Sequence, residues 1–512
     1  MNRRDFMKAS TIGLIGAGVT GHGLAAEEGR SHPLLQPEIN DGVPSPRDVK
    51  LSIKPVMTNI VHSAAWEGPC RWKEVPPAEE QKSAEEQFLR WPQQMRSGGL
   101  GKAAGLRILE PVHLIFREDF TLRPEDFARL EPDMAATDAI YMVAGGAGLP
   151  GCQIALRYHK PILLLGLNCR NVYVAGYLRS KGCEVHVAAD DKELAELASL
   201  LRARKALRET KILFPSDRGL PPAASDSIWD LDDLQRRLGV RVQQISYREM
   251  SDRMEAMLAD KPAREQAEGA AEELLRRAQR SFIERQYVVR SLQFYQTIRS
   301  LMQRHACNAF TIECFEFCTS RLPQQWGITP CLLHALFQDG DCASSCEGDM
   351  SSLVTVRLLM SVAGKSCHQG NGDPKGPGVF RINHSAPSLK MNGFNEPDLP
   401  FQLGRFTAKG FGAKAVVDFM NNREKTVTVA RINPLADRIL VLRGELVGAS
   451  GWNQDVIGCS VEAVIRAPEG RLDEYLHRRA DYGNHLQWVY GDYTRQLKNL
   501  CEMLQIKVEL FV

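Results

Sequence analysis

Short hydrophobic runs alternate with helical patterns along the first part of the chain. Each run has the length and apolar residues of a buried strand, and the segment 190–207 predicts one long helix. Strands that alternate with helices are typical of a parallel sheet covered by helices, so we expect an α/β domain over residues 48–207. The glycine-rich segment 144–151 is either a ligand-binding edge of this sheet or a plain turn. The predicted strands are Leu51–Ile60, Val112–Arg117, Asp138–Val143, Pro161–Leu165 and Cys183–Ala188.

A second alternating segment follows and predicts a second α/β domain over residues 208–365. It opens with two apolar strands and continues with a long helical stretch. A buried strand and a last helix complete it. The predicted elements are Lys211–Ser216, Arg241–Ser246, the stretch from Ala263 to about His305, Asn308–Glu316 and Ser351–Ala363.

The pattern changes in the last part of the chain, where short β segments are separated by turn residues. This spacing predicts a third domain over residues 366–512, built as an antiparallel sheet or barrel. The predicted helix 494–505 carries its apolar residues on one stripe and precedes a final strand, Lys507–Val512. The predicted β segments before it are Ala413–Phe419, Thr426–Ile432, Ile439–Leu446 and Val461–Ala467.

The first 29 residues have the pattern of an export signal. Arg3 and Arg4 are followed by Phe6 and Lys8, then by a weakly apolar stretch and small residues before Glu27. The paired arginines indicate the twin-arginine pathway, which exports folded proteins, and we expect a periplasmic or otherwise exported product. An ordinary Sec signal or a basic tail is the alternative. Residues 30–47 form a proline-rich leader.

Composition and charge exclude two classes of protein. The chain has 512 residues, of which 44% are hydrophobic and 25% charged, as in an ordinary soluble globular protein. Its 64 Lys and Arg against 62 Asp and Glu leave a formal charge of +2, without the basic surplus of a nucleic-acid binder. The sequence lacks an apolar run of roughly 18 residues, so it does not predict a membrane span.

The chain contains 13 cysteines, an odd number, and they form no Cys-x-x-Cys pair. Five of them lie close together, which raises the alternative of an iron–sulfur site in an exported redox protein. Their spacing matches no ferredoxin pattern, so we favour buried free cysteines. The five are Cys314, Cys318, Cys331, Cys342 and Cys346.

Polar residues that could take part in binding or catalysis lie in three segments. The first is Cys346–Met350, where Glu347 and Asp349 stand between a strand and a helix. Carboxylates there suit a hard cation or a sugar hydroxyl, although they also cap helices. The second is a predicted polar loop, Cys367–Asp373, with His384 just beyond it. The third is Tyr482–Asp492, which contains His485.

At these three segments the sequence resembles the L-fucose isomerase-like and L-arabinose isomerase superfamily. The resemblance is most specific from Asn308 to the end of the chain. Glu347, with Gly364 closing the following helix, matches the family's metal-binding acid, and Gly483–His485 matches its last histidine motif. The resemblance implies two doubly wound parallel-sheet α/β domains followed by a β-rich, barrel-like C-terminal domain.

The resemblance also implies an aldose–ketose isomerase with a divalent metal, expected to be Mn²⁺, which works through a metal-bound cis-enediol. Its implied metal ligands are Glu347, Asn371, Asp373 and His485, with Glu347 and Asp373 catalytic; His384 and Asn484 are expected to bind substrate. Asn371 stands where the family has a carboxylate. An amide oxygen still binds a cation but cannot act as a base.

Each of these residues also has a purely structural interpretation. His485 and His384 are then ordinary histidines, of the core and of a loop, and Asp349 is a helix cap or a partner of a ligand. Glu313 and Glu316 lie on the predicted strand before the site, where alternation turns them away from Cys314 and does not bring them to the ion by itself.

Three hypotheses about function follow. The first is an exported, metal-dependent sugar isomerase-like enzyme, and the second an inactive carbohydrate- or metal-binding relative. The third is the redox protein built on the cysteines. The expected partners are a small sugar substrate and the twin-arginine export machinery, and the resemblance implies a homo-oligomer. We expect no nucleic-acid partner and no membrane span in the mature chain.

Overall fold

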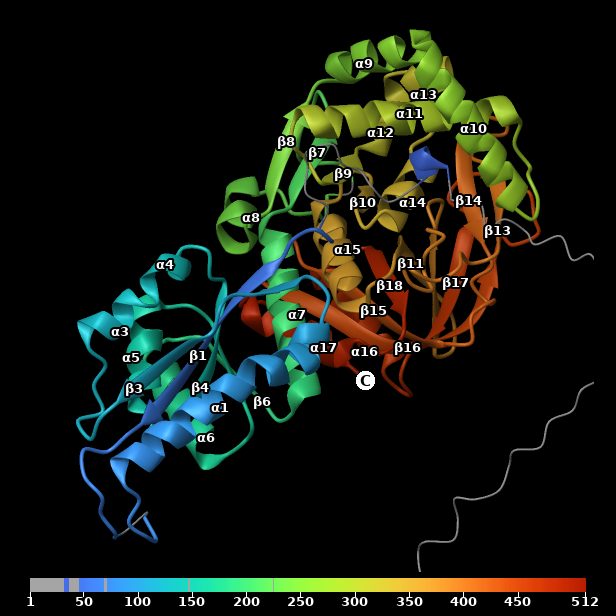
Figure 1. Cartoon of the computed structure of the whole chain (residues 1–512). Coiled ribbons are helices and arrows are strands. Elements are labelled where there is room, and N and C mark those ends of the chain that lie inside the picture. Colours follow the sequence, from blue (N-terminus) through green and yellow to red (C-terminus); the bar gives the residue numbers. More distant parts are fainter. Residues whose placement is uncertain (1–31, 36–45, 69–70, 146–147, 224) are drawn as a thin grey trace, which may run out of the picture.

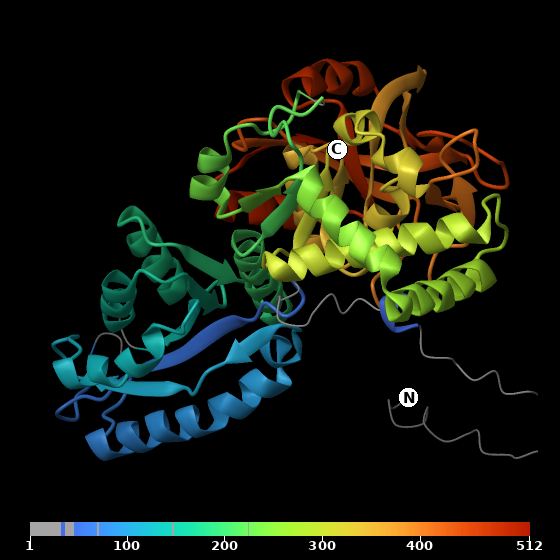
Figure 2. The ribbon, with the colours of Figure 1, turned by 90° about the horizontal axis from the view of Figure 1, so that it is seen from above.

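The computed structural model describes residues 32–35, 46–68, 71–145, 148–223 and 225–512 (Figure 1). The predicted export signal lies outside these residues, as does most of the predicted leader. The chain forms two parallel sheets covered by helices and a strand-rich C-terminal sheet, as predicted. Seen from two directions, the N-terminal sheet and its helices project to one side of a body formed by the other two sheets (Figures 1 and 2).

The N-terminal sheet has the strand order β2-β1-β4-β5-β6, with β3 beside β1, and its strands are parallel. Helices α1, α2 and α7 pack on one face and α5 and α6 on the other. The predicted strands and the long helix are confirmed. The strands are β1 (Leu51–Ile60), β2 (Leu106–Ile108), β3 (Val112–Phe116), β4 (Ala139–Ala144), β5 (Ile162–Leu165) and β6 (Val185–Ala188); the helices are α1 (Pro77–Ser97), α2 (Gly99–Lys102), α3 (Pro124–Ala128), α4 (Glu131–Met134), α5 (Leu149–Tyr158), α6 (Cys169–Ser180) and α7 (Asp191–Arg208).

The middle sheet is also parallel and has the order β10-β9-β7-β8. Because β9 and β10 are neighbours in register, their carboxyl ends, Ile312 and Cys346, lie side by side. The strands are β7 (Lys211–Pro215), β8 (Arg241–Ile245), β9 (Ala309–Ile312) and β10 (Ala343–Cys346); the helices are α8 (Leu231–Leu238), α9 (Tyr247–Ala259), α10 (Lys261–Arg277), α11 (Arg285–Arg304), α12 (Cys314–Thr319), α13 (Leu322–Trp326), α14 (Cys331–Asp339) and α15 (Met350–Ala363).

Two predictions about this region need correction. The predicted strand Asn308–Glu316 ends at Ile312, because the Glu313 carboxylate accepts hydrogen bonds from the backbone N–H groups of Phe315 and Glu316 and starts α12. The predicted helical stretch from Ala263 to His305 is two helices. α10 ends at Arg277, and α11 begins only at Arg285.

The C-terminal strands close into a barrel. Pairing runs β15-β18-β11-β12-β17-β16 and returns from β16 to β15, with β19 added beside β16. The predicted polar loop Cys367–Asp373 is wrong, since from His368 onward it belongs to β11. The strands are β11 (His368–Gly376), β12 (Val379–His384), β15 (Thr426–Ile432), β16 (Arg438–Ser450), β17 (Val461–Arg466), β18 (His485–Tyr490) and β19 (Lys507–Phe511); β13 (Phe401–Arg405) and β14 (Ala413–Val417) form a hairpin, and the helices are α16 (Leu472–Arg478) and α17 (Thr494–Met503).

Helix α15 joins the middle sheet to the barrel. Residues 350–360 are all buried, as expected of a helix surrounded by protein on every side. It packs against β10 on one side and against β15 and β18 on the other. The start of α15 therefore lies where the middle sheet meets the barrel. Among the described residues, no helix is long and apolar enough to cross a membrane.

Candidate metal centre

A tight turn between β10 and α15 presents Glu347. The N–H of Asp349 donates to the carbonyl of Cys346 at 3.2 Å, and both central residues of the turn have positive φ, 64° at Glu347 and 65° at Gly348. Gly348 fits because a Cβ there would lie 3.1 Å from a carbon of Pro222. A left-handed backbone is unfavourable at Glu347, and such strain is found mainly at functional positions.

Two histidines from the barrel face this glutamate. Nε2 of His384, at the end of β12, lies 3.3 Å from one carboxylate oxygen of Glu347, and Nε2 of His485, at the start of β18, lies 3.4 Å from the other. The rings of the two histidines are 5.4 Å apart. One ligand atom from each of the three residues lies within 4.8 Å of the other two. The group joins the end of a middle-sheet strand to two strands of the barrel.

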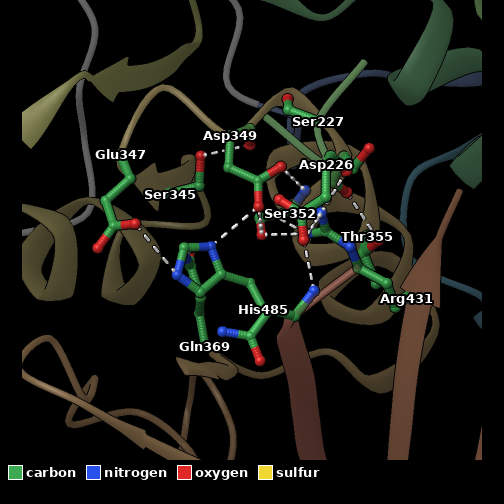
Figure 3. Close-up of polar contacts among 12 residues, drawn as sticks. Asp226, Ser227, Ser345, Glu347, Asp349, Ser352, Thr355, Gln369, Arg431 and His485 are labelled. Carbon is green, nitrogen blue, oxygen red and sulfur yellow. Dashed lines mark hydrogen bonds and ion pairs between the residues drawn. The ribbon is translucent and has the colours of Figure 1, made fainter. Parts of the chain in front are cut away.

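Asp349 orients His485 from behind. Its carboxylate lies 2.9 Å from Nδ1 of His485 and also receives a hydrogen bond from Nη1 of Arg431 at 2.6 Å (Figure 3). It caps α15 as well, by accepting from the N–H of Ser352 at 3.0 Å. Because an ionised carboxylate only accepts, Nδ1 of His485 carries a proton directed at Asp349, and Nε2 is the ring atom that faces Glu347 and would bind an ion.

The charges around the group favour ionised carboxylates. Burial alone would raise the pKa of Glu347, but the hydrogen bond from His384 and the charge of His485 lower it below its usual value. Burial opposes the ionisation of Asp349 too, yet Arg431 and His485 hold the pKa of Asp349 well below its usual range. The pKa of His384 is raised to about 10, against the effect of burial, by Cys459 and Glu347.

These donors fit a divalent first-row transition ion. One carboxylate and two imidazoles suit Mn²⁺, Fe²⁺ and related ions better than they suit Mg²⁺ and Ca²⁺, because Mg²⁺ and Ca²⁺ prefer oxygen ligands only. The fixed proton on Nδ1 of His485 matches the carboxylate–histidine–metal arrangement of metalloenzymes. Nδ1 of His384 is buried, and the Cys459 thiol is the neighbour that, with Glu347, raises the pKa of this imidazole.

Comparison with known proteins points to sugars. No family profile matches the chain. Over 341 residues it is 24% identical to the sulfoquinovose isomerases of Priestia aryabhattai and of Priestia megaterium, an alignment that covers 63% of this chain and 70% of each relative. The chain is thus distantly similar to a sugar isomerase. The part of the predicted resemblance that concerns a sugar isomerase is thereby confirmed.

The remaining predicted site residues have other partners in the structure. Asp373, on β11, pairs with Arg381 of the neighbouring strand at 3.3 Å, and both side chains are more than two-fifths exposed. Asn371 accepts a hydrogen bond from the side chain of Asn484 at 2.7 Å. Asp373 is not among the histidine, cysteine and carboxylate side chains that form the candidate ligand group of the described residues, whereas Asn371 lies opposite His485 in the pairing of β11 with β18. His384, predicted to bind substrate, takes a ligand position in that group instead.

Glu313 is a second carboxylate near the group, at the carboxyl end of β9. It is only 4% exposed, and its Cβ would lie 3.5 Å from a Cβ placed on Gly348. Burial, together with the charges of Glu316 and Glu347, raises the pKa of Glu313. The alternation of side chains along a strand does not apply to Glu313, because β9 ends at Ile312 and Glu313 caps α12. Recognising Glu313 as an N-cap residue would have placed it correctly.

The cysteines do not take part in the ligand group. The 12 cysteines of the described residues are all free, and most are buried. The candidate metal group found among those residues contains no thiol. This arrangement fits the interpretation of buried free cysteines better than that of an iron–sulfur site.

The glycine-rich segment 144–151 borders a cavity far along the chain from this group. The cavity, of about 570 Å³, lies at the carboxyl ends of β4 and β5, and Trp91 and Tyr141 line it. Residues 146 and 147 lie outside the described part of the chain. A cavity at this position fits the ligand-binding interpretation of the segment.

Proposed function

We propose that this protein is a metal-dependent aldose–ketose isomerase that acts on a small sugar. One observation carries the proposal: Glu347, His384 and His485, from three different strand ends, converge on one point. The distant similarity to sulfoquinovose isomerases supports a sugar as the substrate. Packing of the middle sheet against the barrel does not by itself require these three side chains to meet.

Glu347, His384 and His485 would hold the ion, which we propose to be Mn²⁺. When bound, such an ion supplies Lewis-acid polarisation of a carbonyl group and orients its oxygen atoms. The protein's own part is to keep the donors in place. Asp349 and Arg431, both fully buried, fix the ring of His485, and the turn at Gly348 fixes Glu347.

Isomerisation also needs a base that moves a proton between C1 and C2 of the open-chain sugar, through an enediol. We assign this step to Glu313, with Glu347 on the other side of the substrate. The pKa of Glu313 is raised by burial, a shift in the direction that suits a group that must both take up and release a proton. Asp373 is the weaker choice because its carboxylate is already paired with Arg381 near the surface.

The direct test combines metal analysis with a panel of aldoses. The protein, loaded with Mn²⁺, is incubated in deuterium oxide with sulfoquinovose and with aldoses that lack a sulfonate. We expect ketose formation with solvent deuterium at C1 or C2. Mn²⁺ binding without conversion of any aldose, and without deuterium uptake, would favour the second candidate function, an inactive binding relative.

We further propose that the chain is exported by the twin-arginine pathway and works in the periplasm as a homo-oligomer. Arg3 and Arg4, followed by Phe6 and Lys8, support the export route. The resemblance to the isomerase superfamily supports the oligomer. Measurement of the molar mass in solution tests it, and a monomer at micromolar concentration would contradict it.

A further inference from the structure

Several thiol groups lie on one side of the candidate metal centre. Cys331 and Cys346 pack together with Ala386 in a small buried cluster, and Cys314 lies against it. Sγ of Cys331 lies 3.1 Å from the hydroxyl of Ser385, and Sγ of Cys459 lies 3.6 Å from the same oxygen. Ser385 directly follows the candidate ligand His384. The cluster is therefore in contact with the elements that carry the ligands.

Within this cluster, Cys314 and Cys346 stand next to the two site carboxylates. Cys314 follows Glu313 at the carboxyl end of β9, and Cys346 precedes Glu347 at the carboxyl end of β10. The two strands are parallel neighbours, with Cys346 opposite Ile312. The Cys314 side chain packs against the small cluster that contains Cys346. Two strand ends thus carry two adjacent pairs of one carboxylate and one thiol.

We propose that Cys314 and Cys346 form a reversible disulfide that disables the metal centre. The proposal rests on the metal centre proposed above. Cys314 is partly exposed, whereas Cys346 is only 3% exposed. A soluble oxidant therefore reaches Cys314 first, and Cys346 lies in place to complete the bridge.

An organic disulfide such as oxidised glutathione is a sufficient oxidant. The thiolate of Cys314 attacks one glutathione sulfur, so that a mixed disulfide forms and one glutathione thiolate leaves. The thiolate of Cys346 then attacks the Cys314 sulfur and displaces the second glutathione. One S–S bond forms in the protein and one breaks in the oxidant, and the two cysteine protons pass to the two released glutathione thiolates.

Bridging these sulfurs must move the strand ends. The two sulfur atoms must come together in a bond of about 2.05 Å with a defined dihedral angle. Glu347 follows Cys346 directly with a left-handed backbone, and the N–H of Gly348 donates to the carbonyl of Ile312 at 3.0 Å. Because Glu313 and Glu347 are each one residue from the bridge, a shift there changes the position of both carboxylates relative to His384 and His485.

The test compares the reduced and oxidised full-length protein. It is incubated with oxidised glutathione, then with dithiothreitol, and peptide mapping by mass spectrometry locates any cross-link. Mn²⁺ affinity is measured by calorimetry in each state. We expect a Cys314–Cys346 link, an affinity at least about tenfold weaker in the oxidised state, and recovery after reduction.

Three variants make the outcome specific. Cys314→Ser and Cys346→Ser should keep the affinity for Mn²⁺ and lose its sensitivity to oxidation, whereas Cys169→Ser, an exposed thiol of α6, should respond as the parent does. A bridge to Cys318 in place of Cys346, no bridge at all, or a bridge with unchanged affinity overturns the proposal. If the reduced parent binds no Mn²⁺, the metal centre itself is wrong, and mapping of the bridge still decides whether these two thiols join.

Discussion

Asp349 holds His485 through Nδ1 at 2.9 Å, while Nε2 of the same ring faces Glu347 at 3.4 Å. The two residues come from different parts of the fold, since Asp349 caps α15 and His485 starts a barrel strand. The carboxylate is itself neutralised by Arg431, with both side chains fully buried. The orientation of one candidate ligand thus depends on an ion pair that solvent does not reach.

We predict that Arg431→Met destabilises the protein strongly. The substitution keeps much of the side-chain volume but leaves the Asp349 carboxylate buried without its cation, a change that costs about 3–5 kcal/mol. Urea unfolding measures the loss. Arg466→Met is the matched control, because the ion pair of Arg466 with Glu445 has more than half of each side chain exposed and contributes about 1 kcal/mol or less. Similar losses from both variants would contradict a special role for Arg431.

We predict that Mn²⁺ stabilises the parent protein and that His485→Ala or Glu347→Gln removes most of that effect. An ion that binds only the folded state adds about 2.7 kcal/mol at a hundredfold excess over its dissociation constant. The melting temperature with and without Mn²⁺ measures it. Asn371→Ala is the comparison, since the side-chain hydrogen bond of Asn371 goes to Asn484 although its backbone lies opposite His485. Loss of the stabilisation by Mn²⁺ in Asn371→Ala would indicate that Asn371 is a metal ligand.

Much of the fold follows from the hydrophobic pattern alone. β1 and β15 occupy their predicted residues, and α7 is shifted by a single residue. The failures occur where a polar side chain overrides the pattern. Glu313 ends β9 by capping α12, and the polar residues after Cys367 belong to a strand because the barrel supplies partners on both sides.

The candidate site is predicted only in part, for a physical reason. Glu347 and His485 have distinctive neighbours in the sequence, whereas the place of His384 depends on how the barrel meets the middle sheet. Counting residues from Glu347 predicts Asn371 and Asp373 as further ligands. In the structure, Asn371 lies opposite His485 and Asp373 opposite Arg381, and the end of β12 carries His384 to Glu347.

We predict that Mn²⁺ binding releases a proton near neutral pH. The pKa of His384 is raised to about 10 in the ion-free protein, so this imidazole is charged at pH 7 and must lose its proton to bind a metal. The charged form stabilises the ion-free protein fully below about pH 6.5, and this contribution is lost as the pH rises toward 10. The apparent Mn²⁺ affinity should therefore increase with pH, by up to about tenfold per unit.

Calorimetry in buffers with different ionisation enthalpies counts the protons released between pH 6.5 and 8.5. Binding to the parent should release about one proton from His384. In His384→Asn the proton release should be lost, and the affinity should be lower. An affinity of the parent that does not change over this pH range would exclude His384 as a ligand that is charged in the free protein.

We predict that changing Arg3 and Arg4 together to Lys keeps the protein in the cytoplasm in a folded state. The twin-arginine pathway requires the arginine pair, whereas a Sec signal needs only positive charge before its apolar stretch. Fractionation of cells, with protease resistance as the measure of folding, gives the result. Arg30→Lys, just beyond the predicted signal, is the control. Normal export of the double variant would indicate the Sec pathway.

We predict that Glu313→Gln abolishes isomerisation while the stabilisation by Mn²⁺ remains. Glutamine keeps one oxygen that can accept from an N–H group at the start of α12, where the carboxylate uses both of its oxygens, so the cap is weakened but retained, and an amide cannot accept the sugar's proton. Loss of a general base lowers kcat by about 10²–10⁴-fold. Asp373→Asn removes the other proposed base, and it should lose only the exposed ion pair with Arg381. If Asp373→Asn is the inactive variant and Glu313→Gln isomerises normally, Asp373 is the base, and β11 must move on substrate binding to bring its carboxylate to the sugar.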